Sequence, residues 1–150
     1  MSSCIFCKIV NGEIPSTKIY EDELVYAFLD ISPINFGHTL VIPKEHHESA
    51  STIPEETAGR MFKVASRIGI AMKRELDMDG YNLHLADGLA AGQVVMHAHL
   101  HVVPGAWKMI STGTGASLPI LKERCLRSLK RSSASSRSIE KKLSDREEMK

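Results

Sequence analysis

Short apolar runs separated by turn-forming residues fill the first hundred positions of the chain. Runs of this length, rich in β-branched and aromatic residues and bounded by Gly, Pro, Asn or Asp, are typical of strands. We predict strands at residues 24–30, 38–43, 81–86 and 94–103. Turn signals at residues 12–16, 30–37 and 87–92 separate them.

The segment between the second and third strands has a different period. Apolar residues at steps of three and four predict one long helix. Its apolar face comprises Ala58, Met61, Phe62, Ala65, Ile68, Gly69, Met72 and Leu76. Thr52 and Glu55 fit a capping box at its start, and Asp79-Gly80 fits a stop. Two strands, one helix and two strands, without βαβ alternation, predict an α+β fold with an antiparallel sheet.

Length and composition place this fold in one domain. The 150 residues are 43% hydrophobic, which allows a core, and residues 1–110 carry the pattern described above. Residues 111–150 form a C-terminal extension, with a short helix expected at 118–129 and disorder expected at 131–150. Ten Lys or Arg against five Asp or Glu follow position 121, so a basic binding tail is the alternative to a solvated one.

Net charge, apolar runs and cysteine count limit the locations and partners expected for the protein. The net charge of +1 favours neither nucleic acid nor membrane as a partner, and no apolar run approaches the roughly 20 residues of a membrane span. The start shows no signal peptide, and three cysteines are too few for a disulfide framework. We therefore expect a cytoplasmic protein, with the nucleus as the alternative.

Three of the seven histidines stand at alternate positions in the last predicted strand. On a strand, His97, His99 and His101 share one face, and the small and apolar residues between them share the other. They could be hydrogen-bonded polar groups on a solvated sheet. They could hold a metal, although the outer pair lies about 13 Å apart, so at most two would bind one ion. They could also supply a nucleophile.

The nucleophile hypothesis places His99 at its centre. A neutral imidazole presents a lone pair on one nitrogen, and its neighbours can fix which nitrogen that is. Attack on phosphorus would give a labile phosphoramidate and divide one displacement into two. The loop before the strand, with Gly88, Gly92 and Gln93, offers backbone N–H groups that suit an anion such as phosphate.

The segment from Gly92 to Val103 resembles the signature of the histidine triad (HIT) family, a Gly-Gln step followed by three alternating histidines. Further segments resemble the same family in the same order. They are residues 4–10, 13–15, 20–22, 27–33 and 37–44, so the resemblance covers about residues 3–104. It implies an α+β homodimer in which two sheets join into one.

The resemblance also implies a function and a set of site residues. Its nucleotide-binding branch cleaves purine nucleotide conjugates at the α-phosphorus, typically as an adenosine 5'-monophosphoramidase, with no organic cofactor. His99 would become nucleotidylated, and His101 and His38 would hold phosphate oxygens or fix the tautomer of the imidazole. The nucleotide-binding positions would be Phe6, Ile9, Ile14, Phe28, Asp30, Ile31, Gly92, Gln93 and Val94. Asp30 would accept hydrogen bonds from the ribose, and the apolar members would surround the base.

Departures from the family pattern affect the substrate. Many members have Asn where this chain has Ala86, and the phosphoramidase branch often has a hydroxyl residue where this chain has Val94. The segment after Pro104 also differs from the usual C-terminus. Cleavage of phosphoramidates could therefore be weaker, or the preferred leaving group could differ.

Cys4 and Cys7 form a Cys-x-x-Cys at the start of the chain. Such a pair can be a redox couple, half of a zinc site, or two ordinary cysteines. The resemblance adds His46 and His97, which match zinc ligands in relatives, so it implies a closed structural Zn²⁺ site. Cys125, His47 and His84 receive no role.

Three functions therefore compete. The first is a nucleotide hydrolase that acts through His99, with dinucleoside polyphosphates as the alternative substrates. The second is a nucleotide-binding regulatory module with little turnover. The third is a metal-dependent hydrolase in which His97 and His99 are catalytic ligands.

Overall fold

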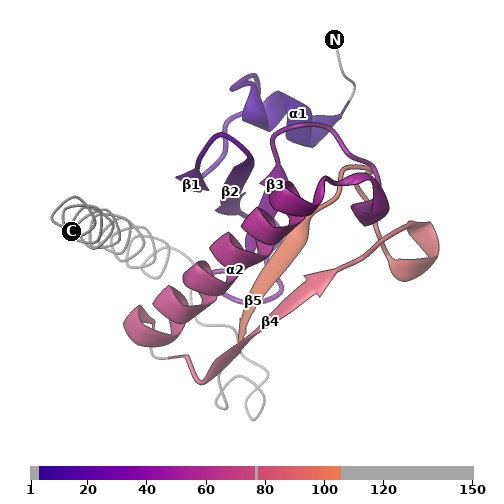
Figure 1. Cartoon of the computed structure of the whole chain (residues 1–150). Helices are drawn as coiled ribbons and strands as arrows, with labels where there is room; N and C mark the ends of the chain where they lie inside the picture. Colours follow the sequence, from indigo (N-terminus) through magenta and orange to yellow (C-terminus); the bar gives the residue numbers. More distant parts are fainter. Residues whose placement is uncertain (1–3, 77, 106–150) are drawn as a thin grey trace, which may run out of the picture.

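The computed structural model describes residues 4–76 and 78–105 (Figure 1). The helix and the disorder expected at 118–129 and 131–150 lie outside these residues. The elements are α1 (Ile5–Val10), β1 (Lys18–Glu21), β2 (Val25–Leu29), β3 (Thr39–Pro43), η1 (Ala50–Thr52), α2 (Glu55–Glu75), β4 (Gly80–Leu85), η2 (Leu89–Ala91) and β5 (Leu100–Gly105). No helix among the described residues combines the length and the apolar character that crossing a bilayer requires.

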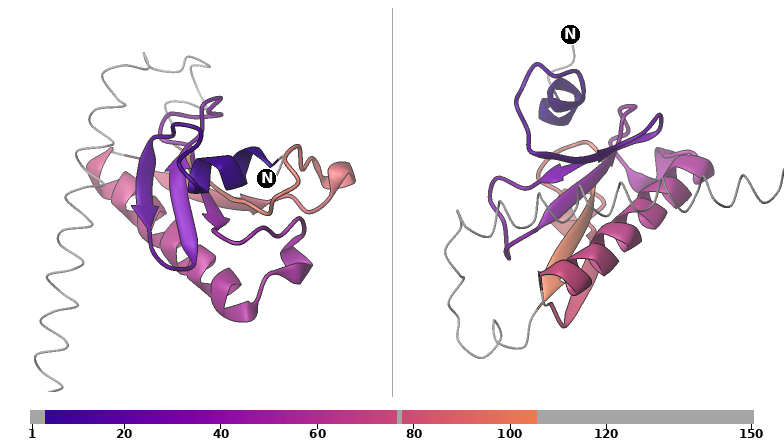
Figure 2. Two further views of the ribbon diagram at one scale, coloured as in Figure 1. Left: turned by 90° about the horizontal axis from the view of Figure 1, so that it is seen from above. Right: turned by 90° about the vertical axis from the view of Figure 1, so that its left-hand side faces the viewer.

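The five strands form one sheet in the order β1-β2-β3-β5-β4, and each neighbouring pair is antiparallel. The long helix α2 lies across one face, and the short helix α1 lies on the opposite face near the end of the sheet that holds β1 and β2 (Figures 1 and 2). The predicted α+β architecture, with an antiparallel sheet and one long helix, is confirmed.

Strand β2 shows why the central strands are apolar on both sides. Val25 and Ala27 pack in the core under α2, whereas Tyr26 and Phe28 pack with Phe6 of α1. A strand covered on both faces has a continuous apolar sequence rather than a strict alternation. The same holds for β3, all five residues of which are buried.

Besides the 3-10 turns η1 and η2, one helix and one strand were not predicted. Helix α1 has six residues and no side-chain cap at Cys4, so it is too short to show a helical period. Strand β1 is an edge strand with charged ends, Lys18 and Glu21, and its register with β2 shifts between Lys18 and Tyr20. Neither segment carries the apolar run on which the other strand predictions depended.

The predicted start of α2 was wrong. Thr52 is not an N-cap, because it belongs to η1 and its hydroxyl donates to the carbonyl of Ser49. The N-cap is Pro54, and α2 begins at Glu55. A residue before proline avoids the helical region, and Ile53 is extended, with a ψ of 130°. The chain therefore cannot enter the helix before Pro54.

The predicted apolar face and end of α2 need correction as well. Ala58 is exposed and Phe62 is 60% exposed, whereas Val64 and Ala71 are buried. The buried stripe is therefore rotated from the predicted one, and α2 crosses the sheet obliquely (Figure 1). The helix ends at Glu75, before the predicted stop.

The last strand is shorter at its start than predicted. β5 begins at Leu100, and it continues through Pro104 and Gly105, which were expected to end it. Residues 94–99 are not a strand, because other bonds replace the ladder: His97 N–H donates to the nearby carbonyl of Val95, and Ala98 N–H donates to that of His47 in a distant loop. The predicted packing side is correct, since Ala98, Leu100 and Val102 all lie in the core under α2.

Candidate functional site

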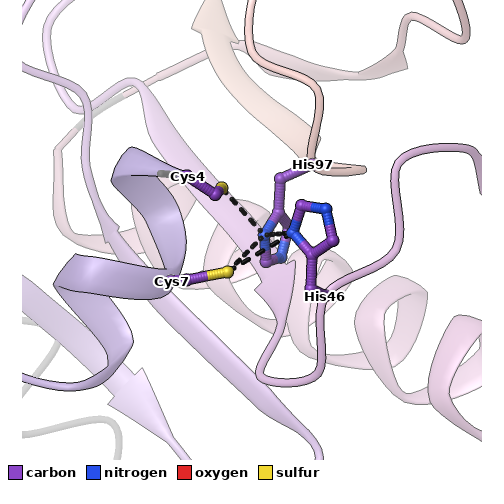
Figure 3. A group of neighbouring side chains, drawn as sticks. All are labelled: Cys4, Cys7, His46 and His97. Carbon is purple, nitrogen blue, oxygen red and sulfur yellow. Dashed lines mark hydrogen bonds between the residues drawn. The ribbon is translucent and has the colours of Figure 1, made fainter. Parts of the chain in front are cut away.

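Four side chains converge where α1 meets the loop before β5 (Figure 3). We call Cys4, Cys7, His46 and His97 the Cys–His cluster. Its sulfur-to-nitrogen distances are 3.5 Å from Cys4 and 3.7 Å from Cys7 to His97 Nδ1, and 3.3 Å from Cys7 to His46 Nδ1. The two Nδ1 atoms are 3.3 Å apart.

These distances fit a tetrahedral ion. Zn–S bonds of about 2.3 Å and Zn–N bonds of about 2.0–2.1 Å give tetrahedral edges of about 3.5 Å between S and N and about 3.3 Å between two N atoms. Two thiols and two imidazoles form a closed set that suits zinc and leaves no coordination position for a substrate. The four residues therefore form a candidate metal site, and its ligand set is the one implied by the resemblance.

A backbone carbonyl outside the cluster orients the imidazole of His97. His97 Nε2 lies 2.9 Å from the carbonyl of Pro43, which can only accept, so the hydrogen is on Nε2 and the Nδ1 lone pair faces the cluster. Burial lowers the pKa of His97 to about 4, so its ring is neutral near pH 7, as a ligand must be. His46 Nε2 lies 4.0 Å from a carboxylate oxygen of Glu48. A metal-ligating histidine usually donates its other ring N–H to an outer partner, as His97 does to the Pro43 carbonyl, whereas 4.0 Å is too long for a hydrogen bond.

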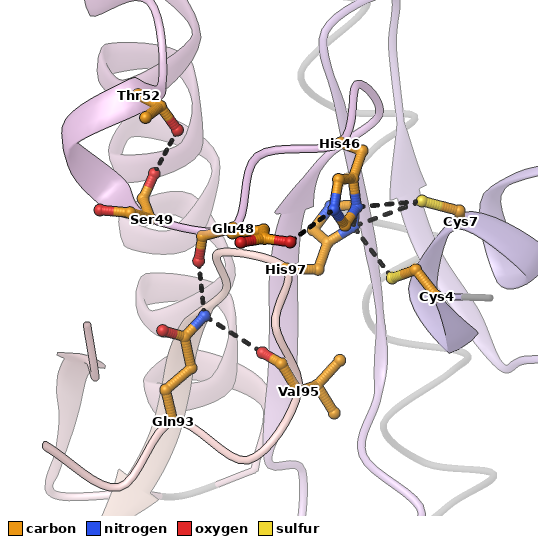
Figure 4. Close-up of polar contacts among 9 residues, drawn as sticks. All are labelled: Cys4, Cys7, His46, Glu48, Ser49, Thr52, Gln93, Val95 and His97. Carbon is orange, nitrogen blue, oxygen red and sulfur yellow. Dashed lines mark hydrogen bonds and ion pairs between the residues drawn. The ribbon is translucent and has the colours of Figure 1, made fainter. Parts of the chain in front are cut away.

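Gln93 links this region to the loop before the histidines (Figure 4). Its amide nitrogen donates to the carbonyls of Glu48 and Val95, at 2.7 and 3.1 Å, and its amide oxygen accepts the N–H of Gly88 at 2.7 Å. The side chain is 1% exposed. Its polar atoms thus hold the loop in shape. A phosphate contact by Gln93 stays a prediction, because its side chain makes these bonds and its backbone N–H donates to the carbonyl of Gly88 at 3.2 Å.

His99 lies directly after this loop, and its tautomer follows from one bond. Its Nδ1 is 2.7 Å from the carbonyl oxygen of His97, so Nδ1 carries the hydrogen. The second ring nitrogen, Nε2, then holds the lone pair, and it has no hydrogen-bond partner within residues 4–76 and 78–105. The ring also meets the edge of Phe6, with centroids 5.3 Å apart.

His38 and His101 form a hydrogen-bonded pair beside His99, and Asp30 lies next to His38. Ile34 N–H donates to His38 Nδ1 at 3.3 Å, and His38 Nε2 lies 2.8 Å from His101 Nδ1. With Nδ1 of His38 accepting, its Nε2 donates to His101, and the hydrogen of His101 is on its own Nε2. A carboxylate oxygen of Asp30 lies 3.4 Å from His38 Nδ1. We call these three residues together with His99 the His99 site.

Burial keeps the imidazoles of this pair neutral. It lowers the pKa of His38, although Asp30 opposes the shift. Burial, with the neighbouring histidines, lowers the pKa of His101 to about 4. The His101 Nε2–H is therefore a neutral hydrogen-bond donor near pH 7. Since the 2.8 Å between His38 and His101 is shorter than the edge expected for two ligands of one ion, this group is a hydrogen-bond relay rather than a metal site.

The residues expected around the base are brought together only in part. Phe6, Ile9 and Phe28 are buried in one apolar cluster with Ile14 at its margin, next to His99. Ile31 is 92% exposed and lies outside that cluster.

The remaining predicted positions lie around the ends of this cluster. Val94 is 87% exposed in the loop before His99, and Gly92 has the positive φ of 92° that glycine tolerates. Ala86 is buried at the end of β4.

Three participants were missed by sequence reasoning. The Pro43 carbonyl orients His97 of the Cys–His cluster, and a backbone acceptor leaves no mark in a sequence; a carboxylate oxygen of Glu48 lies 4.0 Å from His46. His84 lies beside His101, with ring centroids 5.7 Å apart. Its position on the predicted strand opposite the histidines was the signal that could have found it.

Comparison with known proteins identifies the family of the chain. The HIT domain family model matches residues 11–107, and the chain belongs to the HIT family. An HIT-like protein of Borreliella burgdorferi is 52% identical over 106 residues, which cover 69% of this chain and 76% of the relative. Adenosine 5'-monophosphoramidase HNT1 of Candida albicans is 39% identical over 122 residues, 79% of each chain.

A solved structure is similar in both sequence and fold. A Zn-bound histidine triad family protein from Mycobacterium smegmatis matches with a TM-score of 0.79 and 38% identity, covering 89% of this chain and 97% of that one. The HIT fold is therefore shown, and the family includes a named phosphoramidase.

Proposed function

We propose that the protein hydrolyses purine nucleotide conjugates at the α-phosphorus, with adenosine 5'-phosphoramidates as the preferred class. One observation carries the proposal: the hydrogen bond of His99 Nδ1 to the His97 carbonyl leaves the lone pair of Nε2 for attack. The name of the Candida albicans relative supports this choice of substrate.

The reaction proceeds in two displacements. His99 Nε2 forms a bond to the α-phosphorus as the P–N bond to the leaving group breaks, and the departing nitrogen keeps the electron pair and takes up a proton from water. Water then attacks the phosphorus of nucleotidyl-His99 and gives its proton to the hydroxide left by the first step, the P–N bond to the imidazole breaks, and the nucleoside monophosphate leaves. The net reaction consumes one water and returns His99 to its starting tautomer.

The neighbours of His99 bind and orient the substrate. The Nε2–H of His101, fixed by His38, donates to a non-bridging phosphate oxygen without bringing a charge. Asp30 uses one carboxylate oxygen to accept Ser32 N–H and can accept ribose hydroxyls with its remaining lone pairs. Phe6 and Phe28 supply an apolar wall on which a base can rest.

We propose further that the Cys–His cluster holds a structural Zn²⁺. The ion would supply no chemistry to the reaction and would fix α1 to the loop before β5. Phe6 lies between the two cysteines, and its ring meets the edges of both His97 and His99. The cluster thus positions the apolar wall beside His99.

We also propose a cytoplasmic homodimer. β4 is the edge of the sheet beside β5 and pairs with no second strand in the described part of the chain, so two copies could join there. Light scattering should give twice the mass of one chain, and a monomer would contradict the proposal. Cell fractionation tests the location.

The test of the function is to trap the intermediate. The protein is mixed with adenosine 5'-phosphoramidate labelled in its adenosine, quenched without acid and analysed by mass spectrometry. We expect adenylyl label on a peptide that contains His99, and none in His99→Ala. His47→Gln is the matched control, since His47 belongs to neither cluster, and it should keep the label. No label on the wild type, together with no turnover, would overturn the proposal.

A substrate panel separates the competing functions. Phosphoramidates, lysyl-adenylate and diadenosine polyphosphates are compared at equal concentration. Faster turnover of the polyphosphates would favour the alternative hydrolase, a reaction compatible with the exposed apolar Val94 beside the site. Tight binding of AMP with no turnover would favour the regulatory module. Immediate loss of turnover on chelation, without loss of structure, would favour the metal-dependent hydrolase.

A further inference from the structure

His84 is a fourth histidine on the face of the sheet that carries His101. The two residues are directly opposed in the antiparallel pairing of β4 and β5, so their side chains lie on the same face. Tyr81, Leu83 and Leu85 of β4 point to the opposite face and pack in the core under α2. His84 is exposed, so its side chain is not part of that core.

The rings of His38, His101 and His84 form a stacked row. The centroids of His38 and His101 are 5.0 Å apart with an interplanar angle of 27°, and those of His101 and His84 are 5.7 Å apart at 28°. The strand order β3-β5-β4 places His101 between the other two. The His101 ring thus has a buried partner on one side and an exposed partner on the other.

We propose that His84 is a positioning residue of the His99 site, which packs on His101 from the solvent side and keeps its ring parallel to that of His38. The inference rests on the proposed function, because His101 is the phosphate donor there. His38 holds His101 through Nδ1 alone, and a single hydrogen bond permits the ring to tilt about it. The second stacked ring opposes that tilt and keeps Nε2–H directed at the phosphate.

The charge of His84 also helps to keep His101 neutral, because it lowers the pKa of that ring. The titratable groups that face His101 are Asp30 and His38 from the chain before and at the start of β3, His99 from its own segment, and His84 from β4. After burial, repulsion by the three histidines lowers the pKa of His101, and Asp30 opposes them. Removing His84 should therefore let His101 take up a proton at a higher pH.

Two variants separate packing from charge. His84→Phe keeps a flat ring and removes the charge, whereas His84→Ala removes both. Asn82→Ala is the matched control, because Asn82 is exposed on the same strand and two residues away. Each variant is assayed with adenosine 5'-phosphoramidate across pH. The free protein, selectively labelled with ¹⁵N-histidine, is examined by NMR for the tautomer and titration of His101.

We expect His84→Ala to lower kcat about tenfold with KM within about twofold, and His84→Phe to keep kcat within about twofold. In both variants the titration of His101 should move up by about half a pH unit, the size expected for one charge at this distance in water. Asn82→Ala should match the wild type in kcat and titration. An unchanged kcat and an unchanged His101 spectrum in His84→Ala would overturn the inference. If the wild type turns over no conjugate, the proposed function fails, while the NMR result still tests the role of His84.

Discussion

The Cys–His cluster and the His99 site are built from the same residue type and differ in where the ring hydrogens lie. In the first, Nδ1 of His97 faces Nδ1 of His46 at 3.3 Å with its hydrogen on the far side of the ring. In the second, His38 and His101 are 2.8 Å apart and share a hydrogen. Converging lone pairs suit a cation, whereas a lone pair that meets a hydrogen suits a relay.

His97 belongs to both regions through different atoms. Its ring joins the Cys–His cluster, and its carbonyl oxygen fixes the tautomer of His99. A metal on the ring would therefore hold the backbone that orients the nucleophile. The comparison teaches that one site can stabilise while the other reacts, although the two share a residue.

The largest expected effect is on turnover. It distinguishes the His99 site from the Cys–His cluster, because metal content and Tm should not change with it. His99→Gln should lower kcat/KM for adenosine 5'-phosphoramidate by at least about 10³-fold, because the nucleophile is lost. Metal content and Tm should stay close to those of the wild type, since the ring holds no ligand position. Metal analysis and thermal unfolding provide these measurements. A variant that loses metal along with activity would show that the two regions are one.

Sequence patterns predicted most of this arrangement, for physical reasons. Alternation along 94–103 gave the correct packing side for Ala98, Leu100 and Val102, because those residues must reach the core wherever the strand begins. The same alternation placed His97 and His99 on a strand, which was wrong. Backbone bonds to Val95 and to the distant His47 take the place of the ladder before Leu100, and no side-chain pattern reports such bonds.

The ligands of the Cys–His cluster and the N-cap of α2 show the same limit of prediction from the sequence. Cys4 and Cys7 are visible as a motif, but their pairing with His46 and His97 came from resemblance, because residues some forty and ninety positions away leave no local signal. Thr52 fits a capping box by spacing, yet Pro54 two residues later fixes where the helix can start. A strong local constraint overrode a weaker one.

The next largest effect is expected on metal content and stability rather than on turnover, the reverse of the His99 variant. Cys7→Ser should lose the bound metal and lower the free energy of unfolding by about 3 kcal/mol, or Tm by about 10 °C, since metal binding is linked to folding. Turnover should fall only as the structure is lost. Cys125→Ser is the matched control for a change of thiol to hydroxyl and should retain the metal. Equal stability of Cys7→Ser and wild type would exclude a structural role.

A substitution of Gln93 is expected to have a smaller effect, on the Cys–His cluster and the His99 site alike. Gln93→Met keeps the size of the side chain and removes three part-buried hydrogen bonds with Gly88, Glu48 and Val95, so three backbone groups lose their side-chain partner. We expect a loss of about 2 kcal/mol in stability and about a tenfold fall in kcat. Leu89→Ala, exposed in the same loop, should change stability little. Denaturant unfolding and steady-state assays measure both, and a fall confined to one of them would show that the loop serves only one region.

The smallest effect concerns pH and the charge of His101. Its pKa in the folded protein is about 4, below the value of about 6.5 for an unfolded chain, because burial disfavours the charged ring. Between these values the unfolded state binds more protons, so this residue makes stability fall as pH drops from about 6.5 to about 4. The slope is at most about 1.4 kcal/mol per pH unit, and less here because solvent screens a partly exposed ring.

His101→Gln removes that dependence and keeps a polar side chain of similar reach. The cost of the substitution, measured by urea unfolding, should therefore be smaller at pH 5 than at pH 7. His97 shifts in the same direction, but metal competes with protons for its ring, so only His101 gives a reading free of that competition. A cost that is equal at both pH values, or larger at pH 5, would mean that His101 is not held neutral. It would then bring a positive charge to the His99 site, and the contrast between a neutral relay and a metal cluster would have to be replaced by one between two cationic sites.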